Sequence, residues 1–583
     1  MLKIPANKEV IPLRTVFRYL RPYVSRITLQ VFVKLSGTVT ELLLPGFLST
    51  ILDTYAAGND LPGVWKMGAL MLLCAILAWA GNVTANRMAT GISRDFILRL
   101  RRDLFTKISS LSASQRDRIT EASLITRLTT DTYNVHNMVD RMQRLGIRAP
   151  IMLLGGILVS LTLDPALTLV LVCTLPLLTL VVVFSSKKGV PMFSKVQEQQ
   201  DRMVRKVQES MTGARVIRAL SRGQTERDAF GGINDELSEK QRIADTTMAA
   251  VSPLTGFILN AGLAVVVLVG ARRVSLGLSQ PGSIIAFLSY FTIILNAMLS
   301  ITRIFVLYSR GSASARRIES VLKEEEDLLP QPAEEKSSAP APHLSFEHVT
   351  FSYHHTTPNV EDINFTLDHG QTLGIIGPTG SGKSTLLSLI LRLYDPDSGR
   401  ILLDGVPLTS CSRDEVCKGV GVVFQNDFLI ADTVRENIRF GRDVTEEQME
   451  SAVDTAQAGF LREKENGLDF ALNVGGHNLS GGQQQRVLIC RAVAADPRLL
   501  LLDDCSSALD YRTDRALRQA LRERHGQATT VIVAQRVSSV MNADRILVME
   551  DGRIIGSGTH AELLAACPVY GELVRIQLGG EAG

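Results

Sequence analysis

The sequence predicts an α-helical membrane domain of six transmembrane helices with long cytosolic extensions, followed by an α/β domain of the P-loop class. Three observations support this fold class. Six long apolar stretches lie between residues 24 and 310 of the 583-residue chain, and a helix of about 20 apolar residues is enough to cross a bilayer. An acidic, proline-rich segment follows them, which is typical of a linker. Beyond it, a short apolar run leads into the glycine-rich sequence GPTGSGKS, a pattern typical of a strand–loop–helix unit that binds phosphate.

The composition excludes several other classes of protein. Hydrophobic residues make up 45% of the chain and charged residues 21%, which excludes a disordered or fibrous chain. The 62 Lys and Arg residues nearly balance the 59 Asp and Glu residues, for a net charge of +3, so we expect no nucleic-acid partner. The seven cysteines form no CxxC pair and have no histidine at zinc-ligand spacing, which favours reduced thiols.

The N-terminal part of the chain lacks the layout of a cleaved signal peptide. Residues 13–20 mix basic and apolar side chains at helical spacing, so we expect an amphipathic elbow helix that lies on the membrane surface. The six spans follow near residues 25–52, 66–88, 138–163, 165–186, 250–272 and 282–309.

The distribution of basic residues predicts the orientation of the spans. Arg and Lys crowd the two long polar loops, after the second and fourth spans, whereas the first two short turns contain neither. The positive-inside rule therefore places the long loops, the N-terminus and the soluble domain in the cytosol, and the spans in the plasma or inner membrane. Arg272 and Arg273, at the outer end of the fifth span, depart mildly from the rule. Apolar residues at three- and four-residue spacing predict that the long loops extend the membrane helices as helical hairpins.

The composition changes sharply twice along the chain and so predicts the domain boundaries. Residues 1–320 form the membrane domain with its elbow helix. Residues 321–343 form the acidic and proline-rich linker, and residues 344–583 form the nucleotide-binding domain.

Two motifs that follow apolar strands predict the nucleotide site. The glycines after strand Leu373–Ile376 let backbone N–H groups surround phosphate oxygens. Lys383 is expected to reach the β- and γ-phosphates, and Ser384 to bind Mg²⁺. A second apolar run, Leu499–Leu502, ends in Asp503, whose carboxylate is expected to bind Mg²⁺ through water. The predicted nucleotide-binding residues of the loop are Gly377, Pro378, Thr379, Gly380, Ser381, Gly382, Lys383, Ser384 and Thr385.

Between these two motifs lies LSGGQ, at residues 479–483. With the P-loop before it and the Asp503 strand after it, this sequence resembles the ABC transporter superfamily. Six spans followed by one ATPase domain resemble its exporter-type (type IV) half-transporters, and the resemblance covers nearly the whole chain. It implies an ATPase that drives transport with ATP and Mg²⁺. It further implies that Tyr353 stacks on adenine, that Gln425 contacts Mg²⁺ and senses the membrane domain, and that residues 507–510 form the D-loop.

The resemblance also implies a dimer. In this family two ATPase domains enclose two ATP molecules head to tail, so that each ATP lies between the P-loop of one subunit and the LSGGQ signature of the other. The Ser480 hydroxyl and the N–H groups of Gly481 and Gly482 would then act on the γ-phosphate of ATP bound to the partner.

Two catalytic positions depart from the family pattern. Asp504 stands where the family has Glu, which places its carboxylate roughly an ångström short, and Gln535 stands where the family has His and lacks the charge that His can carry. The combination resembles the degenerate-site subunit of a heterodimeric multidrug exporter. It implies a low-turnover site and a homologous partner half-transporter that retains Glu and His. A homodimer with two slow sites is the alternative.

The membrane domain gives weaker indications of the cargo. Lys34 and Glu41 share one face of the first span, and charges at this depth usually face the bundle interior or a water-filled cavity. They either line the transport pathway or pair with each other or with a neighbouring helix. Further candidates for the pathway are Asn260, Asn296 and Arg303. A mixed polar and apolar lining suits small or amphipathic cargo, whether drug, lipid or peptide.

Three functions remain open from the sequence. The first is a subunit of an ATP-driven exporter, and the second is an ATP-gated regulatory or channel-like membrane protein. The third is an importer of metal chelates that has the exporter fold. An intact signature argues against the second, because the signature is needed only where the opposite site turns over. The family resemblance places the segments that couple the two domains near Ser112–Glu121 and Met211–Ile217.

Overall fold

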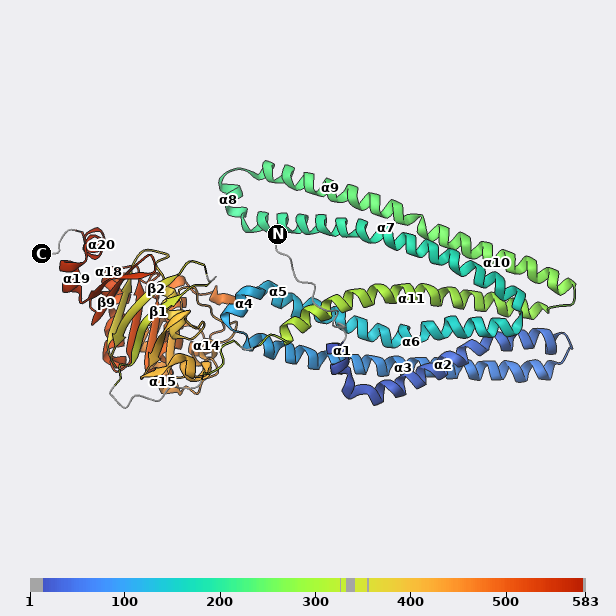
Figure 1. Ribbon diagram of the computed structural model, residues 1–583, viewed down its shortest axis with the longest axis horizontal. Coiled ribbons are helices and arrows are strands. Elements are labelled where there is room, and N and C mark those ends of the chain that lie inside the picture. The colour runs from blue at the N-terminus through green and yellow to red at the C-terminus, as the bar shows by residue number, and fades with distance from the viewer. Residues whose placement is uncertain (1–13, 326, 332–340, 354–355, 580–583) are drawn as a thin grey trace. The chain divides into compact units, whose positions relative to one another are not determined.

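The structure of the chain is a computed structural model that describes residues 14–325, 327–331, 341–353 and 356–579 (Figure 1). Its residues cluster into two compact units. The first comprises Met1–Ser109 and Ala122–Glu324, and the second comprises Ser110–Glu121 and Glu325–Gly583. A short segment between two membrane helices therefore belongs to the same unit as the soluble domain. The proline-rich part of the predicted linker, residues 332–340, lies outside the described residues.

The first unit is built from helices. In chain order these are α1 (Arg14–Leu20), α2 (Val24–Thr50), α3 (Leu61–Ser110), α5 (Glu121–Thr126), α6 (Thr132–Leu163), α7 (Pro165–Thr212), α8 (Ala214–Ala219), α9 (Gly223–Ala249), α10 (Val251–Ser275) and α11 (Pro281–Leu322). Six of the described helical segments are long and apolar enough to cross a membrane, which confirms the six predicted spans. Helix α3 alone has 50 residues, and a rise of about 1.5 Å per residue makes it far longer than the hydrocarbon core of a bilayer.

Close packing of helices forms the core of this unit. Figure 1 shows α6 and α11 side by side, and α7 beside α9 and α10. Phe287, Tyr290 and Phe291 of α11 are fully buried, and the Tyr290 hydroxyl donates a hydrogen bond to the Leu42 carbonyl oxygen at 2.6 Å. Helices α2 and α3 touch through glycine, because a Cβ at Gly37 would lie 3.1 Å from the Asn82 backbone nitrogen. Such contact is typical of membrane helices, in which small residues let backbones approach.

Asp164 stabilises the turn between α6 and α7. Its Oδ1 accepts hydrogen bonds from the backbone N–H groups of Ala166 at 2.9 Å and Leu167 at 3.3 Å, so it caps α7 at the point where Pro165 begins the helix. Its Oδ2 lies 2.8 Å from Arg273 Nε. Arg273 is one of the two arginines that depart from the positive-inside rule. It therefore has a carboxylate partner at the same end of the helices.

The second unit contains two β-sheets with helices around them. The four-stranded antiparallel sheet has the order β2-β1-β4-β5, and the six-stranded sheet has the order β10-β9-β3-β8-β7-β6. The strands are β1 (Leu344–Phe351), β2 (Val360–Leu367), β3 (Thr372–Ile376), β4 (Ser398–Leu403), β5 (Val406–Pro407), β6 (Val420–Val423), β7 (Leu499–Asp503), β8 (Thr529–Ala534), β9 (Arg545–Glu550) and β10 (Arg553–Gly558). The helices are α4 (Ala113–Ile119), α12 (Lys383–Ile390), α13 (Arg413–Cys417), α14 (Val434–Arg439), α15 (Glu446–Thr455), α16 (Gly481–Val493), α17 (Tyr511–His525), α18 (Val537–Val540), α19 (His560–Ala566) and α20 (Pro568–Leu578).

Parallel pairing positions the functional loops of the six-stranded sheet. Strand β3 pairs in parallel with β8, β8 with β7, and β7 with β6. Their carboxyl ends therefore share one edge of the sheet, which is where open α/β sheets bind ligands. All five residues of β7 are buried, as expected for the centre of a parallel sheet. An α-helical membrane unit followed by an α/β unit confirms the predicted fold class.

We predict that Asp164→Ala lowers the apparent Tm of the purified protein in nanodiscs, because it removes both a helix cap and the partner of Arg273. The expected cost is about 1 kcal/mol for the cap and up to about 3 kcal/mol more for the broken ion pair. Asp164→Asn keeps the cap acceptor and should cost less. Asp60, which accepts from the Gly63 N–H at 3.0 Å, provides the control. If Asp60→Ala is as damaging as Asp164→Ala, the ion pair does not contribute.

Candidate functional site

The glycine-rich loop between β3 and α12 has the backbone that its sequence requires. Gly380 and Gly382 have φ values of 89° and 95°, in the left-handed region that favours glycine. A Cβ at Gly382 would lie 2.7 Å from the Asn359 carbonyl oxygen, so only glycine fits there. Helix α12 begins at Lys383, and the free N–H groups of its first turn are suited to phosphate oxygens.

Lys383 is held against the loop. Its Nζ donates hydrogen bonds to the carbonyl oxygens of Gly377 at 3.0 Å and Pro378 at 2.7 Å. Burial lowers the pKa of Lys383, while the Asp503 and Asp504 carboxylates act in the opposite direction. The ammonium therefore lies where it can neutralise phosphates bound by the loop.

Two adjacent carboxylates stand at the end of β7. Burial raises the pKa of Asp503, whereas a hydrogen bond with the Ser384 side chain and the charge of Lys383 lower it. Burial also raises the pKa of Asp504, and so does the neighbouring Asp503, against Arg536 and Lys383. A hydroxyl and a carboxylate side by side are the oxygen ligands that Mg²⁺ prefers, so Ser384 and Asp503 fit the predicted metal role.

The backbone of Asp504 is fixed on both sides. Its N–H donates to the Val533 carbonyl oxygen at 2.9 Å, and its own carbonyl oxygen accepts from the Ser507 hydroxyl at 3.0 Å. Its φ is 47°, a conformation uncommon for a residue other than glycine. Only the side chain can therefore adjust the position of the Asp504 carboxylate.

The two glutamines follow β8 and β6, the strands that lie on either side of β7 in the same sheet. Gln535 follows β8 and is exposed, and its carbonyl oxygen accepts from Gln577 Nε2 of α20 at 2.9 Å. Gln425 lies two residues after β6 and is also exposed. Both therefore stand at the edge of the sheet that carries the P-loop.

Tyr353 lies beside the start of α12. Its hydroxyl donates to Thr385 Oγ1 at 3.4 Å, and its ring makes an edge-to-face contact with the ring of Tyr394 at 5.1 Å between centroids. More than a third of its surface, 37%, is exposed. An aromatic face next to the P-loop suits the adenine-stacking role predicted for it.

The LSGGQ signature forms the start of α16. Ser480 caps this helix in a capping box with Gln483, whose Oε1 accepts the Ser480 N–H at 3.0 Å. Ser480 and Gly481 are exposed and Gly482 is half-buried. Gln485 ties the D-loop to this helix, because its Oε1 accepts the Ala508 N–H at 3.2 Å and its Nε2 donates to the Ser507 hydroxyl at 3.4 Å.

This arrangement of motifs agrees with comparisons with known protein families. Residues 27–298 match the family described as ABC transporter transmembrane region, and residues 360–507 match the family described as ABC transporter. The chain belongs to the ABC transporter family. It is an ABC half-transporter, with one membrane domain and one ATPase domain that uses ATP with Mg²⁺ to drive transport. The predicted family, cofactors and multi-pass membrane location are thereby confirmed.

Similar proteins are found across bacteria. The chain is 34% identical to the uncharacterized ABC transporter ATP-binding protein YfiB of Bacillus subtilis, over 97% of this chain and 98% of that protein. It is 31% identical to a fatty acid ABC transporter ATP-binding/permease protein of Mycobacterium tuberculosis, over 87% of this chain and 80% of that protein. Its fold is similar to that of a bacterial Atm1-family ABC exporter solved with ATP bound, with a TM-score of 0.78, 21% identity, and coverage of 97% of this chain and 99% of that chain.

The first predicted coupling segment of this ABC half-transporter contacts the ATPase domain. The hydroxyl of Tyr394 donates to Asp117 Oδ2 of α4 at 2.6 Å. Burial and the Asp117 carboxylate raise the pKa of Tyr394, so the hydroxyl remains a donor at neutral pH. Because Tyr394 also contacts Tyr353, a continuous set of side chains joins α4 to the P-loop helix. The sequence analysis did not single out Tyr394, because its position in the fold is not encoded in a motif.

The start of the predicted linker is held by the same segment. Ser112 Oγ donates to Asp327 Oδ2 at 2.7 Å, and Gln115 Nε2 donates to the Glu325 carbonyl oxygen at 2.5 Å. The acidic composition of the linker predicts that it stays unpacked. Among the described residues, however, its acidic end is bonded to α4, because the N-terminal capping hydroxyls of that helix provide donors.

The predicted pathway residues have different surroundings in the membrane domain. Lys34 is 3% exposed and donates to Asn86 Oδ1 at 3.0 Å, while Glu41 Oε1 lies 2.6 Å from Arg148 of α6. Each therefore has a partner on a neighbouring helix. Glu41, Arg148 and Asn296 also line a cavity of 230 Å³, whereas Asn260 and Arg303 are exposed. Arg148 directly precedes an apolar run in the sequence. A charge at that position was a signal for a buried or pathway-lining group, but it was not among the predicted residues.

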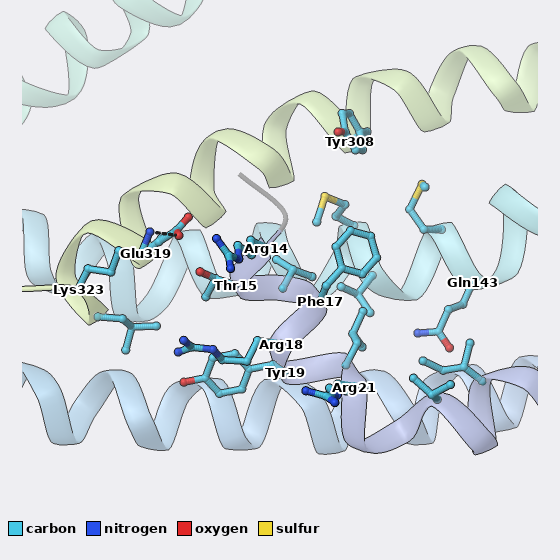
Figure 2. Close-up of a pocket in the computed structure, with 18 residues that line it drawn as sticks. Arg14, Thr15, Phe17, Arg18, Tyr19, Arg21, Gln143, Tyr308, Glu319 and Lys323 are labelled. Atoms are coloured by element: carbon cyan, nitrogen blue, oxygen red, sulfur yellow. Dashed lines mark ion pairs between the residues drawn. The ribbon is translucent and has the colours of Figure 1, made fainter. Parts of the chain in front are cut away.

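A larger cavity of 1070 Å³ lies between α1, the start of α2, α6 and the end of α11, and we call it the elbow cavity. Its apolar lining includes Val16, Phe17, Val24, Met138 and Met142. Its basic lining consists of Arg14, Arg18, Arg21 and Lys323. Figure 2 shows Glu319 and Lys323 at one end, where they form an ion pair of 2.6 Å, and Gln143 at the other. The helical pattern of residues 13–20 predicts the elbow helix, but only the packing of α1 against α6 and α11 creates this cavity.

We predict that Tyr394→Phe weakens coupling without weakening ATP binding, because it removes the hydrogen bond to Asp117 and keeps the ring next to Tyr353. A hydrogen bond to a charged group contributes about 1.5–3 kcal/mol, so ATP-induced protection of the membrane helices against trypsin should need at least about tenfold more ATP. Binding of a fluorescent ATP analogue should be unchanged. Tyr511→Phe, at an exposed tyrosine of α17, is the control. Unaltered protection in Tyr394→Phe would show that this contact does not transmit the signal.

Proposed function

We propose that this half-transporter is the low-turnover subunit of a heterodimeric ABC exporter. It binds MgATP at a degenerate site and supplies its intact signature to the catalytic site of a homologous partner. The observation that carries this proposal is the pair of replacements at the catalytic positions, Asp504 and Gln535, beside an intact P-loop and an intact LSGGQ.

The fixed backbone of Asp504 supports a slow site. A side chain that is one methylene shorter could still reach the attacking water if the backbone moved forward. The hydrogen bonds to Val533 and from Ser507 oppose that movement. A displacement of about 1 Å can reduce a reaction rate ~10²-fold, and Gln535 supplies no positive charge to offset the loss.

Two exposed surfaces support the need for a partner. Ser480 and Gly481 are exposed at the start of α16, where their donors can reach a phosphate presented from outside the chain. Helix α8 overlaps the second predicted coupling segment. Val216 in this helix is 61% exposed, and the flanking Met211 and Leu220 are 74% and 65% exposed. Apolar side chains gathered at a helix end outside the membrane spans are typical of a surface that another protein covers.

The sharpest prediction concerns ATP hydrolysis by the co-expressed pair. Gly481→Asp places a carboxylate against the partner's γ-phosphate, and like charges in a partly desolvated interface cost several kcal/mol, so turnover should fall at least ~100-fold. A Cβ at Gly481 meets its nearest neighbour, Ala508 Cβ, at 3.9 Å, so the variant should fold. Gly481→Ala is the matched neutral control, and most of its activity should remain.

The second variant of this experiment is Asp504→Asn. It removes a carboxylate that, on this proposal, is already too far from the attacking water. Most of the turnover of the pair should remain. Nucleotide trapping would verify that both sites still load. If Asp504→Asn abolishes hydrolysis while Gly481→Asp is tolerated, the assignment of slow and fast sites is wrong and a homodimer becomes the better explanation.

For the cargo, we propose an amphiphile with an anionic head and an apolar chain. The elbow cavity supports this class, because its walls are largely apolar and its lining contains four basic side chains and one carboxylate, Glu319, which already pairs with Lys323. Among the described residues, no carboxylate forms an ion pair with Arg14, Arg18 or Arg21. A relative named as a fatty acid transporter agrees with the same chemistry.

We expect a photoactivatable C16 fatty acid to label the elbow cavity. Replacing Arg14, Arg18 and Arg21 together by Gln should reduce labelling at least about tenfold, since each basic residue contributes about 1 kcal/mol to binding an anionic lipid head. Arg26→Gln, at an exposed arginine that pairs with Asp95, is the control. Equal labelling by the corresponding C16 alcohol, or an equal loss in Arg26→Gln, would contradict an anionic cargo at this position.

A further inference from the structure

Three polar side chains meet at one end of the four-stranded sheet. His343 directly precedes β1, His369 lies in the turn between β2 and β3, and Asp404 lies in the turn between β4 and β5. The register explains why they meet, because Leu344 of β1 is opposite both Leu367 of β2 and Leu403 of β4. The opposite end of β1 leads to Tyr353, at the predicted nucleotide site. At about 3.3 Å per residue, the eight residues of β1 separate the cluster from Tyr353 by roughly 20–25 Å.

The ligand atoms of these side chains are close together. His343 Nδ1 and His369 Nδ1 are 2.8 Å apart, and His369 Nε2 lies 2.9 Å from Asp404 Oδ1. One suitable atom from each residue lies within 4.8 Å of the others. The two rings are 4.2 Å apart between centroids.

Hydrogen bonding restricts how the two imidazoles can face each other. His369 Nε2 beside a carboxylate carries the proton in the neutral ring, which leaves a lone pair on His369 Nδ1. Thr529 Oγ1 lies 3.0 Å from His343 Nδ1 and accepts the Gly370 N–H at 3.1 Å. When the Thr529 hydroxyl donates to His343, both Nδ1 atoms present lone pairs to each other. In that state a metal ion between the two nitrogens would satisfy both lone pairs. In the alternative state His343 Nδ1 carries the proton and donates to His369 Nδ1, and the Thr529 hydroxyl donates to the Asp368 carbonyl oxygen at 3.5 Å.

We propose that His343, His369 and Asp404 form a binding site for a divalent transition-metal ion of the Zn²⁺ class. Two imidazoles and one carboxylate, with water completing the coordination, are ligands that Zn²⁺ accepts. Mg²⁺, the ion of the ATP site, prefers oxygen ligands.

To hold one ion, the side chains must rearrange, because His343 lies at Nδ1 of His369 whereas Asp404 lies at Nε2 of the same ring. Metal–nitrogen bonds of about 2.0–2.1 Å in a tetrahedral site separate two nitrogens by about 3.3–3.4 Å, so the imidazoles must open by roughly half an ångström. His369 and Asp404 have side chains that are 63% and 50% exposed, so both can turn toward the ion. His343 is 3% exposed and gives a fixed ligand. The Asp404 backbone is tied to the His343 carbonyl oxygen through its N–H at 2.9 Å.

A bound ion would cross-link the residue that precedes β1 to two turns of the four-stranded sheet, at the point where the linker enters the ATPase domain. His343 follows the proline-rich segment directly, and the other two ligands belong to turns of the sheet. The ion would therefore stabilise the folded domain by mass action, as does any ligand that binds only the native state. It would take no part in ATP hydrolysis, because of its distance from the P-loop.

The test uses the full-length chain in nanodiscs, after removal of any histidine tag and after metal chelation. Calorimetric titration with ZnCl₂ and the change in Tm are measured on the unaltered protein and on the double variant His369→Ala/Asp404→Ala. Both residues are exposed, so the variant should fold, and binding of a fluorescent ATP analogue verifies this. We expect the unaltered protein to bind one more Zn²⁺ per chain than the variant and to gain several degrees in Tm. Each single substitution should weaken binding at least about tenfold, as loss of one ligand does.

The matched control is His348→Ala. His348 Nδ1 lies 2.7 Å from Asp362 Oδ1 on the same sheet, with both side chains exposed, but no second histidine joins this pair among the described residues. Zn²⁺ binding and the gain in Tm should be unchanged in His348→Ala. Equal Zn²⁺ binding by the unaltered protein and the double variant would overturn the proposal and leave a proton as the bridge between the imidazoles. An equal loss in His348→Ala would also overturn it, because it would indicate unspecific histidine binding.

Discussion

Parallel pairing of β3, β8 and β7 is the constraint on which the ATP site depends. The pairs Ile376–Ala534 and Asp503–Val533 align the carboxyl ends of these strands. The P-loop, the Asp503 carboxylate and Gln535 come from distant parts of the chain, yet the register brings them to one edge of the sheet. The same register ties the Asp504 N–H to the Val533 carbonyl oxygen. The strand pairing that builds the site therefore also holds the backbone of Asp504 in place.

The membrane domain contains several charged side chains among its apolar helices. Charged groups at membrane depth are stable only when they are paired or face water. Glu41 with Arg148, and Asp164 with Arg273, are joined across helices at 2.6 and 2.8 Å. The buried Lys34 is bonded to the neutral side chain of Asn86 at 3.0 Å. Ion pairs and hydrogen bonds to charged groups thus join α2, α3, α6, α7 and α10 in addition to apolar packing.

The segment predicted to couple the two domains, Ser112–Glu121, belongs by its contacts to the same unit as the ATPase domain. Helix α4 is connected in sequence to the membrane helices, but its residues cluster with the ATPase domain. Its hydrogen bonds join Asp117 to Tyr394, and Ser112 and Gln115 to the start of the linker. A small polar contact can transmit a rotation of one domain to the other and still separate without exposing a large apolar surface.

Much of the site was predictable because its motifs are local. The P-loop, Ser384, Asp503 and the signature serine each depend on a few neighbouring residues, and the six spans follow from length and apolarity. The roles of Asp504 and Gln535 were indicated only by departure from the family pattern, and their catalytic consequence is a proposal that depends on the partner. The end of the third span at Leu163 and the start of the fourth at Pro165 were also predictable, because proline is favoured at the first position of a helix.

Other features depend on residues that are far apart in the sequence. The partners of Lys34 and Glu41, the contact of Tyr394 with Asp117, the elbow cavity and the meeting of His343, His369 and Asp404 could not be read from any local pattern. Each of them requires side chains from elements whose separation is set by strand register or by helix packing. The sequence by itself determined the chemistry that each segment can perform, because motifs and apolar periodicity act over a few residues. Only the tertiary structure decided which charges, rings and imidazoles face one another, because that depends on long-range packing of the whole chain.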